Sequence, residues 1–212
     1  MVDFTLYLNE FIIVVFAMFF AVISPGPDFA FVLKQSITYG RKASLYSSIG
    51  IGLGIGVHVI YTILGVGLII SKSIIAFTIV KFLGAGYLIY LGYKSFTSKG
   101  FKIDGDMCGE KKEISNTKAF VLGFLCNALN PKATLFFVSL FTVIVDINTP
   151  LVVQSIYGLV CIGITTLWFV FLSLILSQQK VRNFFNSFGK YFDRAVGLVL
   201  ISMGLKIAFS RN

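Results

Sequence analysis

Residues 24–28, Ser-Pro-Gly-Pro-Asp, lie inside an apolar run that extends over about residues 6–33. Proline has no backbone N–H to donate, and its ring clashes with the carbonyl group one turn earlier in a helix. The run is therefore expected to form two half-helices, the second beginning at Ser24–Pro25 or at Gly26–Pro27. The fold must accommodate this break, and the charged Asp28 beside it, within an otherwise apolar segment.

The composition indicates that a membrane surrounds this break. Of the 212 residues, 57% are hydrophobic and 13% are charged, whereas soluble domains hold about 45–50% apolar and about 25% charged residues. The apolar residues form continuous stretches instead of alternating with polar ones, which indicates helices and not barrel strands. These stretches cover about residues 6–33, 45–70, 74–93, 119–145, 151–176 and 192–209. The sequence therefore predicts an all-α integral membrane protein with six transmembrane helices.

A second break occurs at the matching position in the other half of the chain. In residues 127–137, NALNPKATLFF, Asn130 is expected to cap a helix that begins at Pro131. The alternative is a pair of packing kinks, but matched interruptions in oppositely inserted halves are typical of inverted repeats at a transport site. We expect one transmembrane domain with two inverted three-helix repeats and broken helices 1 and 4. The first repeat covers about residues 1–94, a cytoplasmic linker about 95–118 and the second repeat about 119–212.

The distribution of basic residues predicts the orientation. Of the 18 Lys and Arg residues, the connectors after the first, third and fifth spans hold three, six and four. Cytoplasmic loops of membrane proteins carry an excess of these residues. We therefore expect these three connectors in the cytoplasm and both termini outside it. The N-terminal run lacks the basic start and cleavage site of a signal peptide, so we expect it to remain as the first span.

Two charged residues follow the prolines directly, Asp28 in the first break and Lys132 in the second. A charge deep in the membrane costs about 2.5–3.5 kcal/mol and usually faces a cavity or a partner. The start of a half-helix favours Asp28 and opposes Lys132, so Lys132 requires an anion. Two interpretations stay open: a permanent ion pair that only joins the halves, or a site where Lys132 meets a bound carboxylate. Asn127 and Asn130 are candidates for orienting hydrogen bonds.

Four glycines occupy every second position near the start of the second apolar stretch. They are Gly50, Gly52, Gly54 and Gly56. This spacing differs from the GxGxxG pattern of a nucleotide-binding loop, and no strand precedes it. Small residues four apart let another helix approach closely. We therefore expect a helix-packing role, and such faces would also suit a homodimer.

The remaining polar residues indicate no metal, cofactor or nucleic acid. A single histidine and three scattered cysteines do not make a metal-ligand set, and the basic residues are spread over connectors instead of forming one face. We expect His58 to pack with hydrogen bonds rather than to relay protons, and Glu10 to reach the membrane interface. Lys81 either extends its charge to the outer surface or serves a function within the membrane.

The chain resembles the LysE/RhtB family of bacterial inner-membrane amino-acid exporters. Four stretches carry the resemblance over essentially the whole chain: SPGPD, GRKASLYSSIGIGLGIGVHV, KFLGAGYLIYLGYKSF and NALNPKATLFFVSLF. The resemblance implies secondary active export of an amino acid from the cytoplasm, driven by proton antiport, and is closer to the threonine/homoserine branch. By similarity, Pro25–Pro27 and Asn130–Lys132 are signature positions of the family.

This implied function leads to a hypothesis for the site. The half-helix N-termini and Lys132 would hold the carboxylate of an amino-acid substrate, because free N–H groups and a positive charge favour an anion. Asp28 would hold the ammonium group and couple transport to a proton. Three other classes fit less well. A membrane-embedded enzyme needs a catalytic assembly, and only isolated groups are present. A passive channel would not depend on a proton gradient, and a sensor subunit would be expected to carry an extramembrane domain.

Overall fold

The computed structural model describes residues 4–24, 26–72, 74–98, 113–146, 148–176 and 179–209, and within these ranges it contains helices and no strand. The elements are η1 (Phe4–Tyr7), α1 (Leu8–Ile23), α2 (Pro27–Thr38), α3 (Arg41–Lys72), α4 (Ile74–Phe96), α5 (Asn116–Ala128), α6 (Pro131–Val143), α7 (Leu151–Ile175) and α8 (Gln179–Phe209). The predicted all-α class is confirmed.

Both proline breaks interrupt the helices where the sequence predicts. α1 ends at Ile23, and α2 begins with Pro27 in its first turn after an extended Gly26. α5 and α6 meet at an angle of 54°. Asn130 caps α6, because its side-chain oxygen accepts a hydrogen bond from the backbone N–H of Lys132 at 2.9 Å. Each break therefore creates a new helix N-terminus within an apolar segment.

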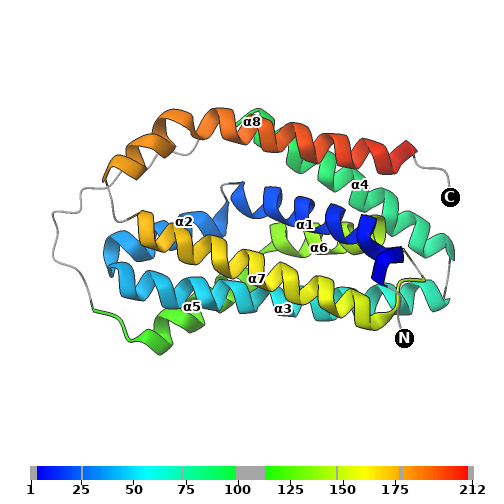
Figure 1. The fold of residues 1–212 in the computed structure, drawn as a ribbon, viewed down its shortest axis with the longest axis horizontal. Helices are drawn as coiled ribbons and strands as arrows, with labels where there is room; N and C mark the ends of the chain where they lie inside the picture. The colour runs from blue at the N-terminus through cyan, green and yellow to red at the C-terminus, as the bar shows by residue number, and fades with distance from the viewer. Residues whose placement is uncertain are drawn as a thin grey trace.

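The helices form an elongated bundle in which α3 packs between α5 and α7, and α4 packs along α8. The α2–α3 turn and the first residues of α5 and α8 lie at one end of the bundle (Figure 1). The start of η1, the α6–α7 connector and the end of α8 lie at the opposite end. The described chain thus runs back and forth along the long axis, and both breaks fall in its middle.

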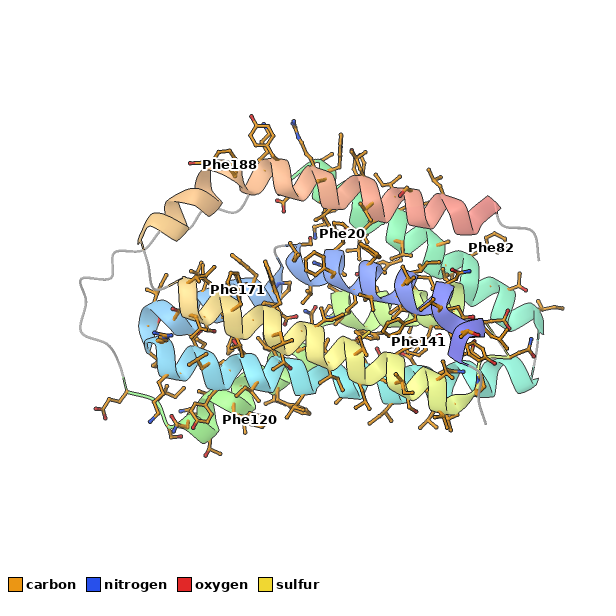
Figure 2. All side chains as sticks on the ribbon, in the orientation of Figure 1. Phe20, Phe82, Phe120, Phe141, Phe171 and Phe188 are labelled. Atoms are coloured by element: carbon orange, nitrogen blue, oxygen red, sulfur yellow. The ribbon has the colours of Figure 1, made fainter. Side chains whose placement is uncertain are left out.

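The outer surface of the bundle is apolar. Phe82, Phe171 and Phe188 are each at least half exposed, whereas Phe141 is buried (Figure 2). Among the described residues, three helices are long and apolar enough to cross a bilayer, Thr5–Ile23, Arg41–Gly65 and Leu151–Ile175, and α5 with α6 passes as one bent span. These features agree with a membrane protein. The full six-span inverted repeat stays a prediction.

The last helix is longer than the sequence predicts. α8 begins at Gln179, 13 residues before the apolar stretch that starts at about residue 192. Its first turns mix basic and aromatic residues, so a search for continuous apolar sequence misses them. The residues Arg182 and Lys190, which the sequence places in a connector, therefore lie within a helix.

The glycines of α3 differ in how closely other helices approach them. A Cβ atom on Gly50 would overlap the Phe120 carbonyl of α5, and one on Gly52 would overlap Thr166 of α7. A Cβ on Gly54 would lie 2.9 Å from Asn127 Cβ, but one on Gly56 would meet only Ile162 at an ordinary 3.6 Å. Three of these glycines thus face neighbouring helices of the same chain, which leaves them unsuited to a homodimer contact.

We predict that Gly50→Ala destabilises the protein and Gly56→Ala does not. The added methyl group at Gly50 meets backbone, which cannot move aside as a flexible side chain can, and such overpacking costs about 1–3 kcal/mol. The thermal unfolding midpoint of each detergent-purified variant measures the difference. Equal midpoints for the two variants would contradict the close α3–α5 contact.

Candidate functional site

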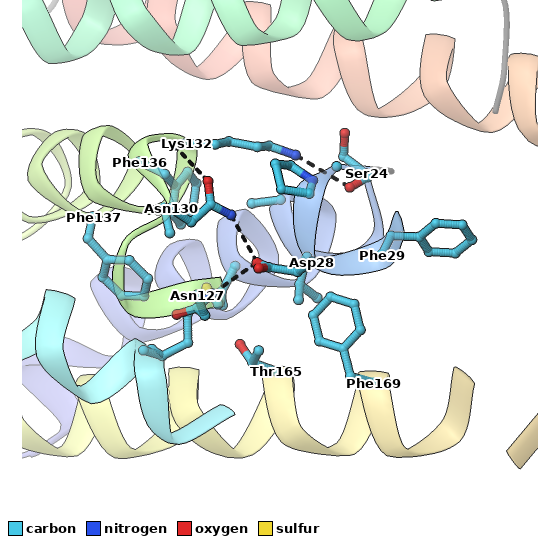
Figure 3. Close-up of a pocket in the computed structure, with 17 residues that line it drawn as sticks. Ser24, Asp28, Phe29, Asn127, Asn130, Lys132, Phe136, Phe137, Thr165 and Phe169 are labelled. Atoms are coloured by element: carbon cyan, nitrogen blue, oxygen red, sulfur yellow. Dashed lines mark hydrogen bonds between the residues drawn. The ribbon is translucent and has the colours of Figure 1, made fainter. Parts of the chain in front are cut away.

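The two helix breaks meet around a small cavity of about 50 Å³ (Figure 3). Six of the residues that the sequence singles out line it: Gly26, Pro27, Asp28, Asn127, Asn130 and Lys132. Pro131 lines an adjacent hollow, and Pro25 lies outside the described residues. The structure thus brings together charged groups that are about 100 positions apart in the chain.

Asp28, in the first turn of α2, is held by side chains of the other break. Its Oδ2 atom accepts hydrogen bonds from Asn127 Nδ2 at 2.9 Å and Asn130 Nδ2 at 3.1 Å, and the Cys126 thiol lies 3.6 Å from Oδ1. Asn130 therefore has two tasks, because its oxygen caps α6 and its nitrogen binds Asp28. The carboxylate is fixed at the junction of α2 with the α5–α6 break.

Lys132, in the second break, in turn contacts the first break. Its ammonium group donates a hydrogen bond to the Ser24 carbonyl at 3.3 Å, at the end of α1, rather than to the Asp28 carboxylate. A Cβ atom on Gly26 would lie 3.2 Å from Lys132 Nζ and 3.5 Å from its Cδ, so the glycine leaves room for the lysine side chain. Each charged group crosses to the opposite break, and the two are not joined as the permanent ion pair that the sequence left open.

The cavity wall combines polar and apolar side chains. Asn127 is buried, and no described residue donates a hydrogen bond to its Oδ1 atom. Phe136 and Phe137 of α6 and Phe169 of α7 also line the cavity, and Thr165 of α7 lies near Phe169. Such a mixture suits a small ligand that carries both charge and an apolar part.

A second, larger hollow of about 560 Å³ adjoins the first. The two share Ser24, Gly26, Pro27, Asn130 and Lys132 in their walls. The second hollow is completed by the second half of α4, by Ser98 just after this helix and by Asp193 of α8. It therefore lies between the two breaks and the α4–α8 pair. The Lys132 side chain therefore lies on the boundary between two spaces.

A buried histidine outside the cavity supports its surroundings. His58 is fully buried, with Nε2 2.8 Å from the Asn127 carbonyl and Nδ1 2.9 Å from the Tyr61 hydroxyl. This carbonyl lies near the end of α5 and also accepts a hydrogen bond from the Asn130 N–H at 2.8 Å. The side chain of Lys81, by contrast, lies outside the described residues.

Glu10, which the sequence places near the membrane interface, is the centre of a group of hydrogen bonds between helices. Its carboxylate accepts hydrogen bonds from Thr149 Oγ1 at 2.9 and 3.1 Å, from the Asp146 N–H at 3.1 Å and from the Tyr157 hydroxyl at 3.3 Å. These contacts join α1 to the α6–α7 connector and to α7, at the end of the bundle opposite the α2–α3 turn. Sequence reasoning missed this cluster because its members are more than 130 positions apart.

The described residues contain no cluster of His, Cys, Asp and Glu that could hold a metal ion. Cys126 and Cys161 are free thiols, and Cys108 lies outside the described residues.

Comparison with known proteins gives consistent matches over most of the chain. A family model described as LysE type translocator matches residues 19–211. The uncharacterized membrane protein YrhP of Bacillus subtilis (strain 168) is 36% identical over 197 residues, which cover 89% of this chain and 93% of that protein.

Two proteins of Salmonella typhimurium carry functional names. The chain is 30% identical to a threonine efflux protein over 193 residues, covering 90% of this chain and 93% of the relative. It is 29% identical to a leucine efflux protein over 197 residues, covering 89% and 90%. No solved structure matches the chain.

Proposed function

Because the chain belongs to the LysE type translocator family, we propose that it is a secondary transporter that exports small amino acids from the cytoplasm by proton antiport. Members of this family are transporters, so the chain is not an enzyme. Relatives named threonine efflux protein and leucine efflux protein support an amino-acid substrate. We favour threonine, homoserine or an amino acid of similar size, moved across the inner membrane of a bacterium.

In this proposal the chain spans the membrane six times as two inverted repeats, with α1–α2 and α5–α6 as the broken spans. The alternation of connectors between the two ends of the bundle supports it. The α2–α3 turn and the first residues of α5 and α8, which adjoin the basic connectors, lie at one end of the bundle. By the positive-inside rule this end would face the cytoplasm and both termini would lie outside.

The observation that carries the proposal is the reciprocal crossing of the two breaks. Asp28 and Lys132 place a negative and a positive group in the wall of one cavity, each held by the opposite half of the chain. A zwitterion needs both signs of charge to replace its hydration. The substrate carboxylate would lie at Lys132 and the N-terminus of α6, and its ammonium at Asp28 and Asn127 Oδ1.

In this proposal the movements of proton and substrate are coupled because a proton and the substrate ammonium group compete for the Asp28 carboxylate. A proton that reaches Asp28 from outside neutralises the group that holds the ammonium, and so favours release of the substrate to that side. Protonation of Asp28, in the first break, would also affect the second half of the chain, because Asp28 is bound by Asn127 and Asn130 of the second break. Binding of a proton or of substrate would thus change the contact between the two repeats.

Alternating access also requires one end to be closed, and the Glu10 cluster supplies a candidate for the closed end. We predict that Glu10→Ala opens this end, because hydrogen bonds to a charged group contribute about 1.5–3 kcal/mol. The site thiol Cys126 reports the opening: with Cys108 and Cys161 replaced, a membrane-impermeant thiol reagent applied from outside should label it about tenfold faster. Glu10→Gln keeps an acceptor for Thr149 and is the matched control. Equal labelling rates in both variants would contradict this role.

The proposed function is tested by exposing cells that express the protein to inhibitory concentrations of single amino acids. Export predicts resistance together with a lower intracellular concentration of the same amino acid. In purified proteoliposomes the transport should saturate with substrate and accelerate with a proton gradient. Linear, gradient-independent flux would instead identify a passive channel.

A further inference from the structure

We propose that the second hollow is a separate binding site for the amino-acid zwitterion, with Asp193 as the residue that binds its ammonium group. This inference rests on the proposed function, and it adds a site next to the one at the helix breaks. Nothing in the family's signature stretches points to Asp193, which lies in α8 and outside both of them.

Asp193 is a buried acid with unused hydrogen-bonding capacity. Its side chain is 3% exposed and lines the hollow. Oδ2 accepts a hydrogen bond from the Ser98 hydroxyl at 2.6 Å, but no described residue donates one to Oδ1. A buried carboxylate is costly unless it is paired and hydrogen-bonded. An acid retained in this position is most simply explained by a cation that arrives from solution.

The backbone around Asp193 is held firmly. One turn further along α8, Gly197 meets Gly92 of α4 so closely that a Cβ on Gly92 would lie 2.7 Å from the Gly197 carbonyl oxygen. This contact fixes α8 against α4 and keeps Asp193 beside Ser98. The carboxylate therefore belongs to a preformed wall of the hollow rather than to a mobile surface side chain.

The opposite charge needed for a zwitterion is supplied by Lys132. Its side chain lines both hollows, so a ligand in the second hollow can place its ammonium at Asp193 and its carboxylate toward Lys132. Ser24 and Ser95, whose hydroxyls lie 3.2 Å apart, add neutral hydrogen-bonding groups to the same wall. An amino acid could pass from this site to the Asp28 site while its carboxylate remains near Lys132.

The alternative is that Asp193 only stabilises the α4–α8 contact through Ser98. The two explanations differ in what the charge does. If Asp193 is structural, Asp193→Asn keeps a side-chain oxygen for the Ser98 hydroxyl and should leave ligand binding unchanged. If Asp193 binds an ammonium group, the loss of its charge removes a ligand site while the fold persists.

The test is equilibrium binding of radiolabelled L-threonine to the purified full-length protein. In the Asp28→Asn background, where the site at the breaks is disabled, we expect saturable binding to persist through the second hollow. Adding Asp193→Asn should abolish it, while adding Glu113→Gln, which removes an exposed acid outside both hollows, should not. Competition by 2,3-dihydroxybutanoate, which replaces the ammonium of threonine with a hydroxyl, should be absent.

The outcomes separate this inference from the proposed function. Loss of all binding in Asp28→Asn alone, or unchanged binding in the Asp28→Asn/Asp193→Asn double variant, overturns the second site. Either result leaves the proposed function intact provided that the wild type still transports amino acids. If the wild type transports none of the amino acids tested, the proposed function itself fails. Elution of the double variant as a single species in size-exclusion chromatography verifies its fold.

Discussion

Asp28→Asn is expected to abolish proton-driven transport while the protein still inserts in the membrane. In inside-out vesicles with an acidic lumen, the wild type should accumulate labelled threonine, and the variant should fall to the level of vesicles without the protein. The physical reason is that asparagine cannot exchange a proton or offer a negative charge to the substrate ammonium. It can still accept the hydrogen bonds of Asn127 and Asn130, so the contact between the breaks should survive.

A second variant separates the charge of Asp28 from its structural contacts. Asp28→Ala removes the acceptor for two buried amide groups, and an unsatisfied buried group costs about 1–3 kcal/mol. We therefore expect Asp28→Ala to unfold at a lower temperature, whereas Asp28→Asn should remain near the wild type. Gradient-driven accumulation that persists in Asp28→Asn would show that another group carries the proton.

The breaks themselves could be predicted from sequence because their cause is local. Proline ends or starts a helix through its own backbone, and Asn130 caps α6 through a neighbour two positions away. A general argument also predicts that Asp28 and Lys132 line the same cavity, because a charge within an apolar bundle is costly unless it faces a cavity or a partner.

The partners of these charges could not be predicted because they depend on how distant helices pack. Asp28 binds two amides rather than Lys132, and Lys132 binds a backbone carbonyl that is exposed only because α1 ends at Ile23. The sequence does not predict the role of Asp193 for a related reason. A single acid at the start of an apolar stretch reads as an interfacial charge, and only the packing of α8 on α4 buries it against Ser98.

Lys132→Met is expected to weaken the binding of amino acids through their carboxylate group. Methionine keeps an aliphatic side chain of similar reach and removes the charge. A charge-assisted hydrogen bond of about 1.5–3 kcal/mol corresponds to a rise of roughly tenfold to a hundredfold in the dissociation constant for threonine. Lys118→Met, which removes an exposed lysine of α5 outside both hollows, is the matched control and should bind as the wild type does.

The decisive measurement for Lys132 compares threonine with 1-amino-2-propanol, the same molecule without its carboxyl group. If Lys132 binds the carboxylate, the wild type should prefer threonine strongly, and Lys132→Met should bind the two ligands almost equally. Loss of the Ser24 contact alone would weaken both ligands by the same factor. An unchanged preference for threonine in the variant would assign Lys132 to holding the breaks together, and the carboxylate would then depend on the N-termini of α2 and α6 alone.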